Sequence, residues 1–211
     1  MRLEYIVLIF WAAYLIGSIP VAFGIARLHG IDIFTVGSGN MGATNVIRAV
    51  GMRWGALTWA LDCAKGILAI YVARQIAPDD HLGKATMIGA IGVVVGHNWS
   101  IGAMILTGKL RGGKGAAAAL GTWLVFLPAW LLAAAFLVWL AIVIATRFVS
   151  LAVLTTTMLV SLAIAVMVVV GDYEPVYISY WIVTALIFYR HRDNIRALIE
   201  GRERRFGTPA E

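Results

Sequence analysis

The sequence predicts an all-α integral membrane protein with seven transmembrane helices, its N-terminus outside and its C-terminus in the cytoplasm. Of its 211 residues, 61% are hydrophobic and 13% are charged, whereas soluble domains carry roughly 45–50% apolar and about 25% charged residues. Long apolar segments alternate with short polar ones, and the Lys and Arg residues concentrate in these short segments. The chain is too short and too apolar to hold a separate soluble domain, so we expect a single transmembrane domain, residues 1–211.

Seven apolar segments account for the seven predicted crossings. They cover residues 5–28, 54–77, 84–106, 116–127, 128–146, 151–170 and 176–189. The stretch 116–146 would form a helix about 46 Å long, too long for one crossing and short for two. We predict two short helices that turn at Leu127-Pro128, because Lys114 and Arg147 then lie on the same side. Gly17, Ser18 and Pro20 predict a kink or close helix contact in the first crossing.

The distribution of charge sets the predicted orientation. The basic connections 29–53 and 107–115, Arg147 and the tail 190–205 all fall on one side. An excess of Lys and Arg marks the cytoplasmic side of a membrane protein. This arrangement collects every polar motif on the cytoplasmic face. It also accounts for the net charge of +6 without nucleic acid as a partner.

Two charged residues lie inside the second predicted crossing. Asp62 and Lys65 are three positions apart and therefore share a helical face, so we expect them to pair or to face a polar interior. A structural ion pair and a direct catalytic role both remain open. The single cysteine, Cys63, excludes an intramolecular disulfide. Four histidines without a close ligand pairing predict that no metal is bound.

The first polar motif interrupts the apolar pattern after the first crossing. It reads Val36-Gly37-Ser38-Gly39-Asn40-Met41-Gly42-Ala43-Thr44-Asn45-Val46-Ile47-Arg48. Gly and Asn permit backbone conformations in which consecutive N–H groups surround an anion. The guanidinium of Arg48 suits phosphate. The motif predicts an anion-recognising loop, and a plain Gly-rich connector is the alternative.

The second motif, Gly112-Gly113-Lys114-Gly115, opens an apolar helix. Free N–H groups at a helix N-terminus, glycines that allow close approach and a lysine together form a phosphate cradle. The spacing does not match a nucleotide-binding P-loop. A basic anchor for anionic lipid is the alternative. His97, in the preceding crossing, indicates either function or a satisfied interior hydrogen bond.

The third motif lies in the basic tail and reads His191-Arg192-x-Asn194-Ile195-x-x-Leu198-x-x-Gly201-x-Glu203. A helix here would place His191, Asn194 and Leu198 on one side, and Arg192 with Arg196 on another. An exposed amphipathic helix that stops the last crossing would explain the arginines. It would not explain His191 and Asn194.

Together the three motifs closely resemble the three signatures of the PlsY family, the bacterial acyl-phosphate:glycerol-3-phosphate acyltransferases. The resemblance runs from the first crossing to Phe206. It implies a seven-helix enzyme of the bacterial inner membrane, monomeric among the membrane lipids, with its active site facing the cytoplasm. It also implies transfer of a fatty acyl group from acyl phosphate to the 1-hydroxyl of glycerol 3-phosphate, giving lysophosphatidic acid and phosphate, with no cofactor and no metal.

The same resemblance suggests roles for individual residues. Ser38 and the 112–114 backbone would hold the phosphate of acyl phosphate. Arg48, Lys114, Ser150 and Asn194 would bind glycerol 3-phosphate, with His191 and Asn194 lining the reacting centre. The catalytic residues implied are Ser38, Lys114, His191 and Asn194. The other substrate-binding residues implied are Gly37, Gly39, Asn40, Thr44, Asn45, Arg48, His97, Gly112, Gly113, Ser150 and Glu203.

Two departures and one rival function accompany the resemblance. The segment between His97 and Lys114 is longer than in the family pattern, and Ala116 stands where a threonine is frequent. The chain lacks the His-x-x-x-x-Asp motif of acyl-CoA-dependent acyltransferases, which favours acyl phosphate as the donor. The rival function is a membrane carrier for phosphate or an organophosphate. Carriers place such groups near the bilayer midplane on broken helices, whereas these motifs gather at one interface.

Overall fold

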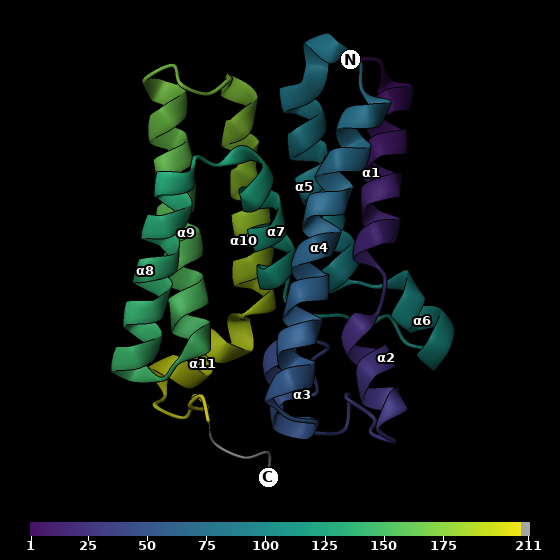
Figure 1. Cartoon of the computed structure of the whole chain (residues 1–211), viewed down its shortest axis with the longest axis vertical. Helices are drawn as coiled ribbons and strands as arrows, with labels where there is room; N and C mark the ends of the chain where they lie inside the picture. Colours follow the sequence, from purple (N-terminus) through teal and green to yellow (C-terminus); the bar gives the residue numbers. More distant parts are fainter. Residues whose placement is uncertain (208–211) are drawn as a thin grey trace.

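The computed structural model describes residues 1–207, and this part of the chain is all-helical (Figure 1). A single isolated bridge, between Ser100 and Arg111, is its only extended pairing. Two short 3-10 helices lie at Asp79–His81 and Pro175–Ser179. The α-helices are α1 (Leu3–Gly17), α2 (Val21–Leu28), α3 (Ala43–Ala49), α4 (Met52–Ile76), α5 (Leu82–Asn98), α6 (Ile101–Thr107), α7 (Ala116–Phe126), α8 (Ala129–Thr146), α9 (Val149–Val169), α10 (Tyr180–Arg190) and α11 (Arg192–Ile199).

The helices form a bundle with two outer groups. Figure 1 shows α8 and α9 on one side, α1, α4 and α5 on the other, and α7 and α10 between them. Glycines allow the closest crossings: a Cβ on Gly66 of α4 would lie 2.1 Å from the Ala118 carbonyl oxygen of α7, and one on Gly121 would lie 2.0 Å from the Cys63 oxygen. Small residues at such crossings are typical of membrane helices, which associate by backbone-close packing.

Several helices are long and apolar enough to cross a bilayer. Within residues 1–207 these segments are Leu3–Leu28, Met52–Ile76, Ala129–Thr146 and Val149–Val169. The predicted all-α membrane architecture is confirmed. The predicted turn at Leu127-Pro128 is also found, since it separates α7 from α8. With 11 residues, α7 rises only about 16 Å, and it begins part-way up the bundle, above α3 and α11 (Figure 1).

Two breaks in the helices position the polar motifs. The first lies between α1 and α2, at Ser18 and Pro20, where the sequence predicts a kink. The second corrects the prediction of one helix over 84–106, because α5 ends at Asn98 and α6 is a separate helix. The Ser100 hydroxyl accepts a hydrogen bond from the Ala103 N–H (2.9 Å) and so caps α6. The Ser100 N–H donates to the Arg111 carbonyl (2.9 Å), which draws the second motif back towards the end of α5.

Candidate active site

The loop of the first motif is organised around one buried amide. Asn45, in the first turn of α3, is 2% exposed. Its Nδ2 donates to the carbonyls of Ile33 (3.0 Å), Val36 (3.1 Å) and Asn40 (3.1 Å). Its Oδ1 accepts from the Ser38 N–H at 3.0 Å. Since these bonds use the amide on both sides, we now propose that Asn45 shapes the loop in place of the direct substrate contact predicted from the sequence.

The rest of this loop stands at the surface around Asn45. Gly37 and Gly39 have φ of 55° and 62°, a region that favours glycine. A Cβ on Gly37 would also lie 2.3 Å from Asn45 Oδ1. The Ser38 side chain is exposed, and Thr44 and Arg48 are half-buried on α3. The Ser38 hydroxyl and the Arg48 guanidinium therefore lie on a loop whose backbone is fixed by the hydrogen bonds of Asn45.

We expect Asn45→Asp to disable this loop. The carboxylate would lose three donated hydrogen bonds and would face three carbonyl oxygens, a buried mismatch of about 1–3 kcal/mol per unsatisfied group. Thermal unfolding in detergent should shift downward, and phosphate binding should weaken. Asp32→Asn is the matched control, because Asp32 is an exposed residue of the same loop that accepts one N–H bond from Phe34. An Asn45→Asp protein with native stability would contradict the structural role of the amide.

The loop of the second motif is held on both sides. The Gly113 N–H donates to the His97 carbonyl at 2.9 Å. From the opposite side, Arg190 donates through Nε to the Gly113 carbonyl (2.9 Å) and through Nη2 to the Gly112 carbonyl (3.3 Å). A Cβ on Gly112 would lie 2.4 Å from the carbonyl oxygens of His97 and Asn98. Only glycine fits at such a close backbone approach.

Arg190 is a site residue that the sequence analysis missed. Its guanidinium also lies over the Trp99 ring, 5.6 Å from the centroid. At the end of the last predicted crossing an arginine is expected from charge orientation alone, so its position carries no specific signal. Its contact with the glycine loop depends on α10 ending beside α7.

A chain of polar side chains joins the second motif to the tail. Lys114 Nζ donates to Asn194 Oδ1. Asn194 Nδ2 and Ser150 Oγ each donate to Glu203 Oε1, both at 2.7 Å. These side chains come from the start of α7, from α9, from α11 and from the tail. The structure therefore brings together four of the predicted site residues across about 90 positions of sequence.

The charges at this site act on one another. Burial lowers the pKa of Lys114 to about 8, with Glu203 opposing the shift and Arg190 and Arg48 adding to it. Burial also lowers the pKa of Arg48, and Glu203 opposes that shift as well. The negative charge of Glu203 thus favours the charged forms of both Arg48, in the first motif, and Lys114, in the second.

His191 occupies the break between α10 and α11 and is 4% exposed. Burial lowers its pKa to about 4, and the charge of Lys114 acts in the same direction. Its Nδ1 lies 2.8 Å from the Ile187 carbonyl, so Nδ1 carries the proton of the neutral ring. Its Nε2 is then a hydrogen-bond acceptor.

His97 does not reach the surface. It is 3% exposed and lies against Lys65 and Asp62 of α4 and behind Gly113. Because the buried ring packs against Gly113, we propose that His97 supports the loop in place of the substrate contact predicted from the sequence. The predicted pairing of Asp62 with Lys65 is confirmed, with 2.6 Å between Oδ1 and Nζ.

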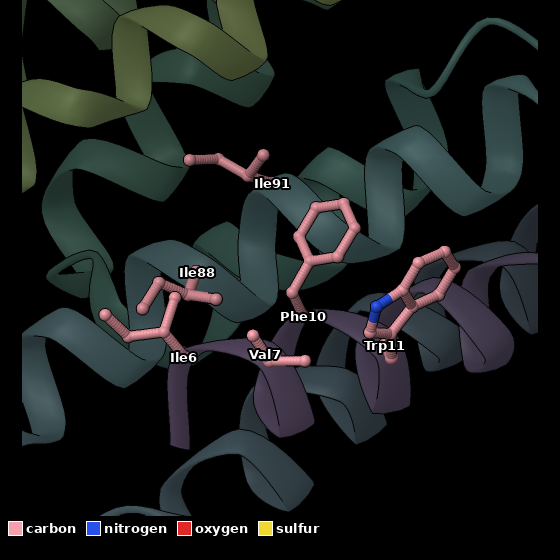
Figure 2. Close-up of a pocket in the computed structure, with 6 residues that line it drawn as sticks. All are labelled: Ile6, Val7, Phe10, Trp11, Ile88 and Ile91. Atoms are coloured by element: carbon pink, nitrogen blue, oxygen red, sulfur yellow. The ribbon is translucent and has the colours of Figure 1, made fainter. Parts of the chain in front are cut away.

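A separate apolar hollow lies along α1 and α5. Figure 2 shows it lined by Ile6, Val7, Phe10, Trp11, Ile88 and Ile91, which include no polar motif residue. It is distinct from the polar site described above.

Comparison with known proteins identifies the family. A model of the family described as glycerol-3-phosphate acyltransferase matches residues 7–201. The chain belongs to the glycerol-3-phosphate acyltransferase family. This confirms the family that the sequence motifs predict, and it favours an acyltransferase over a carrier.

Individual relatives extend over the same length. The glycerol-3-phosphate acyltransferase of one strain of Thermus thermophilus is 40% identical over 94% of both chains. That of Aquifex aeolicus is 40% identical over 92% of this chain and 95% of its own. The crystal structure of PlsY (YgiH), an integral membrane glycerol 3-phosphate acyltransferase, in its glycerol 3-phosphate form is 38% identical over 96% of both chains, with a TM-score of 0.83. Its lysophosphatidic acid form aligns with a TM-score of 0.79. The chain is therefore a multi-pass membrane protein of this acyltransferase family.

Proposed function

We propose that this protein transfers a fatty acyl group from acyl phosphate to the 1-hydroxyl of glycerol 3-phosphate. The hydroxyl oxygen bonds to the acyl carbon, the bond from that carbon to the phosphate oxygen breaks, and the hydroxyl proton ends on the released phosphate. Acyl phosphate is an activated mixed anhydride, so positioning and charge stabilisation supply much of the catalysis. The products are lysophosphatidic acid and inorganic phosphate.

The observation that carries this proposal is the polar chain from Lys114 through Asn194 and Glu203 to Ser150. This polar chain begins at the glycine loop. A second cation, Arg48, interacts electrostatically with the same carboxylate, that of Glu203. Two anionic phosphate groups must approach each other in this reaction, and two cations offset their repulsion. We assign the donor phosphate to Ser38 and the glycine loop, and glycerol 3-phosphate to Arg48, Lys114, Ser150 and Asn194.

The test is phosphate release from palmitoyl phosphate by purified protein in lipid, with and without glycerol 3-phosphate. We expect release to require glycerol 3-phosphate, to yield lysophosphatidic acid and to be lost in Lys114→Ala and Ser38→Ala. Palmitoyl-CoA in place of palmitoyl phosphate should give no product. Uptake of glycerol 3-phosphate into vesicles without any product would favour the carrier.

We also propose seven crossings, a bacterial inner-membrane location, a cytoplasmic active site and a monomeric enzyme of one domain. The basic connections gathered at the polar end of the bundle support this orientation. Replacing the single cysteine, Cys63, by alanine allows one new cysteine to be labelled at a time. A cysteine at Lys109 should react with an impermeant maleimide only from the cytoplasmic side, and one at Asp172 only from outside. Both positions are exposed. Labelling of both from one side would contradict the orientation.

A further inference from the structure

A cluster of ionisable groups lies inside the bundle, behind the site. Asp62, Lys65 and His97 are 2%, 5% and 3% exposed. The ammonium of Lys65 lies 2.6 Å from Asp62 Oδ1 and donates to the Ile19 carbonyl at 2.9 Å. That carbonyl belongs to the break between α1 and α2. Ionisable groups inside a membrane span are costly and generally mark function.

His97 connects this cluster to the glycine loop. Lys65 Nζ lies 3.4 Å from His97 Nδ1. An ammonium only donates, so Nδ1 accepts and the proton of the neutral ring is assigned to Nε2. The Nε2 edge faces Gly113, where an added Cβ would lie 2.1 Å from Nε2 and 2.8 Å from the Met41 carbonyl oxygen. The ring edge therefore meets Gly113 where the first-motif loop, through Met41, also approaches it.

Stability alone does not require such a pair. Replacing both members of a buried ion pair by apolar residues of similar volume is often neutral or stabilising, whereas removing one member leaves an uncompensated charge. The cluster instead contacts the break between α1 and α2 and, through His97, Gly113 of the second-motif loop, where Met41 of the first-motif loop also lies close.

We propose that Asp62 and Lys65 are positioning residues of the acyltransferase. Through His97 they hold the 112–115 loop against the first-motif loop, in the arrangement that binds the phosphate of the acyl donor. The inference rests on the proposed function and adds to it a support inside the membrane. Lys114, which we assign to glycerol 3-phosphate, belongs to the same loop, so displacement of the loop should weaken the use of both substrates.

The test compares a single variant with a charge-neutral double variant. Lys65→Met should lower kcat/KM for palmitoyl phosphate about tenfold or more, because small displacements of a binding loop cost up to about 100-fold. The double variant Asp62→Leu with Lys65→Met carries no buried charge. We expect its unfolding temperature to return close to native while its kcat/KM stays low for palmitoyl phosphate and for glycerol 3-phosphate. A double variant with native kinetics would overturn the proposal and leave the pair a purely structural feature.

His97→Asn provides a second test that keeps both charges. Its amide oxygen can accept from Lys65 as Nδ1 does, but the shorter side chain no longer reaches Gly113. We expect weaker binding of palmitoyl phosphate, and unchanged binding would also overturn the proposal. Ser161→Ala is the matched control, since it removes a buried hydroxyl bonded to Thr184 between α9 and α10, and its kinetics should be native.

Binding of palmitoyl phosphate, measured as a thermal shift, separates this inference from the proposed function. Native protein that forms no lysophosphatidic acid would refute the function. The positioning role would still predict tighter binding by native protein than by Lys65→Met or His97→Asn. Equal binding by all three would refute the positioning role whatever the activity.

Discussion

Replacing Lys114 by methionine is expected to lower kcat/KM by roughly 100- to 1000-fold, the range seen when one donor that stabilises developing charge is removed. Lys114 Nζ is the cation of the glycine loop, and its partner Asn194 leads on to Glu203 and Ser150. Methionine keeps the length and the apolar stem but provides no charge. Steady-state kinetics with palmitoyl phosphate and glycerol 3-phosphate measure the effect.

The pH dependence of kcat/KM tests the role of Lys114 independently. With its pKa lowered to about 8, Lys114 in the free enzyme is charged below that value and loses its proton above it. The cation that we propose to bind phosphate is thus lost as the pH rises. We expect kcat/KM to fall about tenfold per unit above roughly pH 8. Lys114→Arg, which stays charged, should remove this fall in whatever activity it retains.

Lys109→Met is the matched control for both measurements. Lys109 lies in the same basic segment and is exposed, so its loss removes the same charge from the loop without touching the polar chain. Its kcat/KM should stay within about twofold of native at physiological salt, where an exposed charge acts weakly. Equal losses from Lys109→Met and Lys114→Met would mean that the loop acts only as a diffuse basic patch.

Gly113→Ala is expected to reduce activity by roughly 100-fold or more, the cost of misplacing a reacting group by about 1 Å. Its methyl group would lie 2.1 Å from His97 Nε2 and 2.8 Å from the Met41 carbonyl oxygen. The loop must shift to relieve these contacts, which disturbs the bonds from Gly113 to the His97 carbonyl and from Arg190 to Gly113. Overpacking of this kind typically costs about 1–3 kcal/mol of stability.

Gly24→Ala is the control for a glycine with free space. No atom lies within 4 Å of its would-be Cβ, and alanine is favoured over glycine within a helix by about 1 kcal/mol. We expect native kinetics and an equal or slightly higher unfolding temperature. Native kinetics in Gly113→Ala as well would show that the loop does not bind phosphate in the conformation described.

The sequence by itself determined the class of the molecule and most of its chemistry. Its apolar segments and their lengths predict helices because lipid offers the backbone no hydrogen bonds. The pairing of Asp62 with Lys65 followed from a spacing of three on one helix, and the break at Leu127-Pro128 from the length of the segment. The motifs around Ser38, Lys114 and Asn194 identified the family, because their glycines and charged residues are adjacent in the sequence and need no tertiary structure to be seen.

Only the tertiary structure decided which of these residues touch. Arg190 carries no local signal, yet it clamps Gly112 and Gly113 because α10 ends beside the start of α7. Asn45 shapes its loop although it stands in the first motif, and His97 packs behind Gly113, because burial depends on packing between distant helices. The apolar pattern of residues 84–106 also did not predict that α5 ends at Asn98. This helix end depends on two hydrogen bonds of Ser100, whose N–H donates to the Arg111 carbonyl and whose hydroxyl accepts from the Ala103 N–H. The first of these is non-local, and hydropathy contains no information about such contacts.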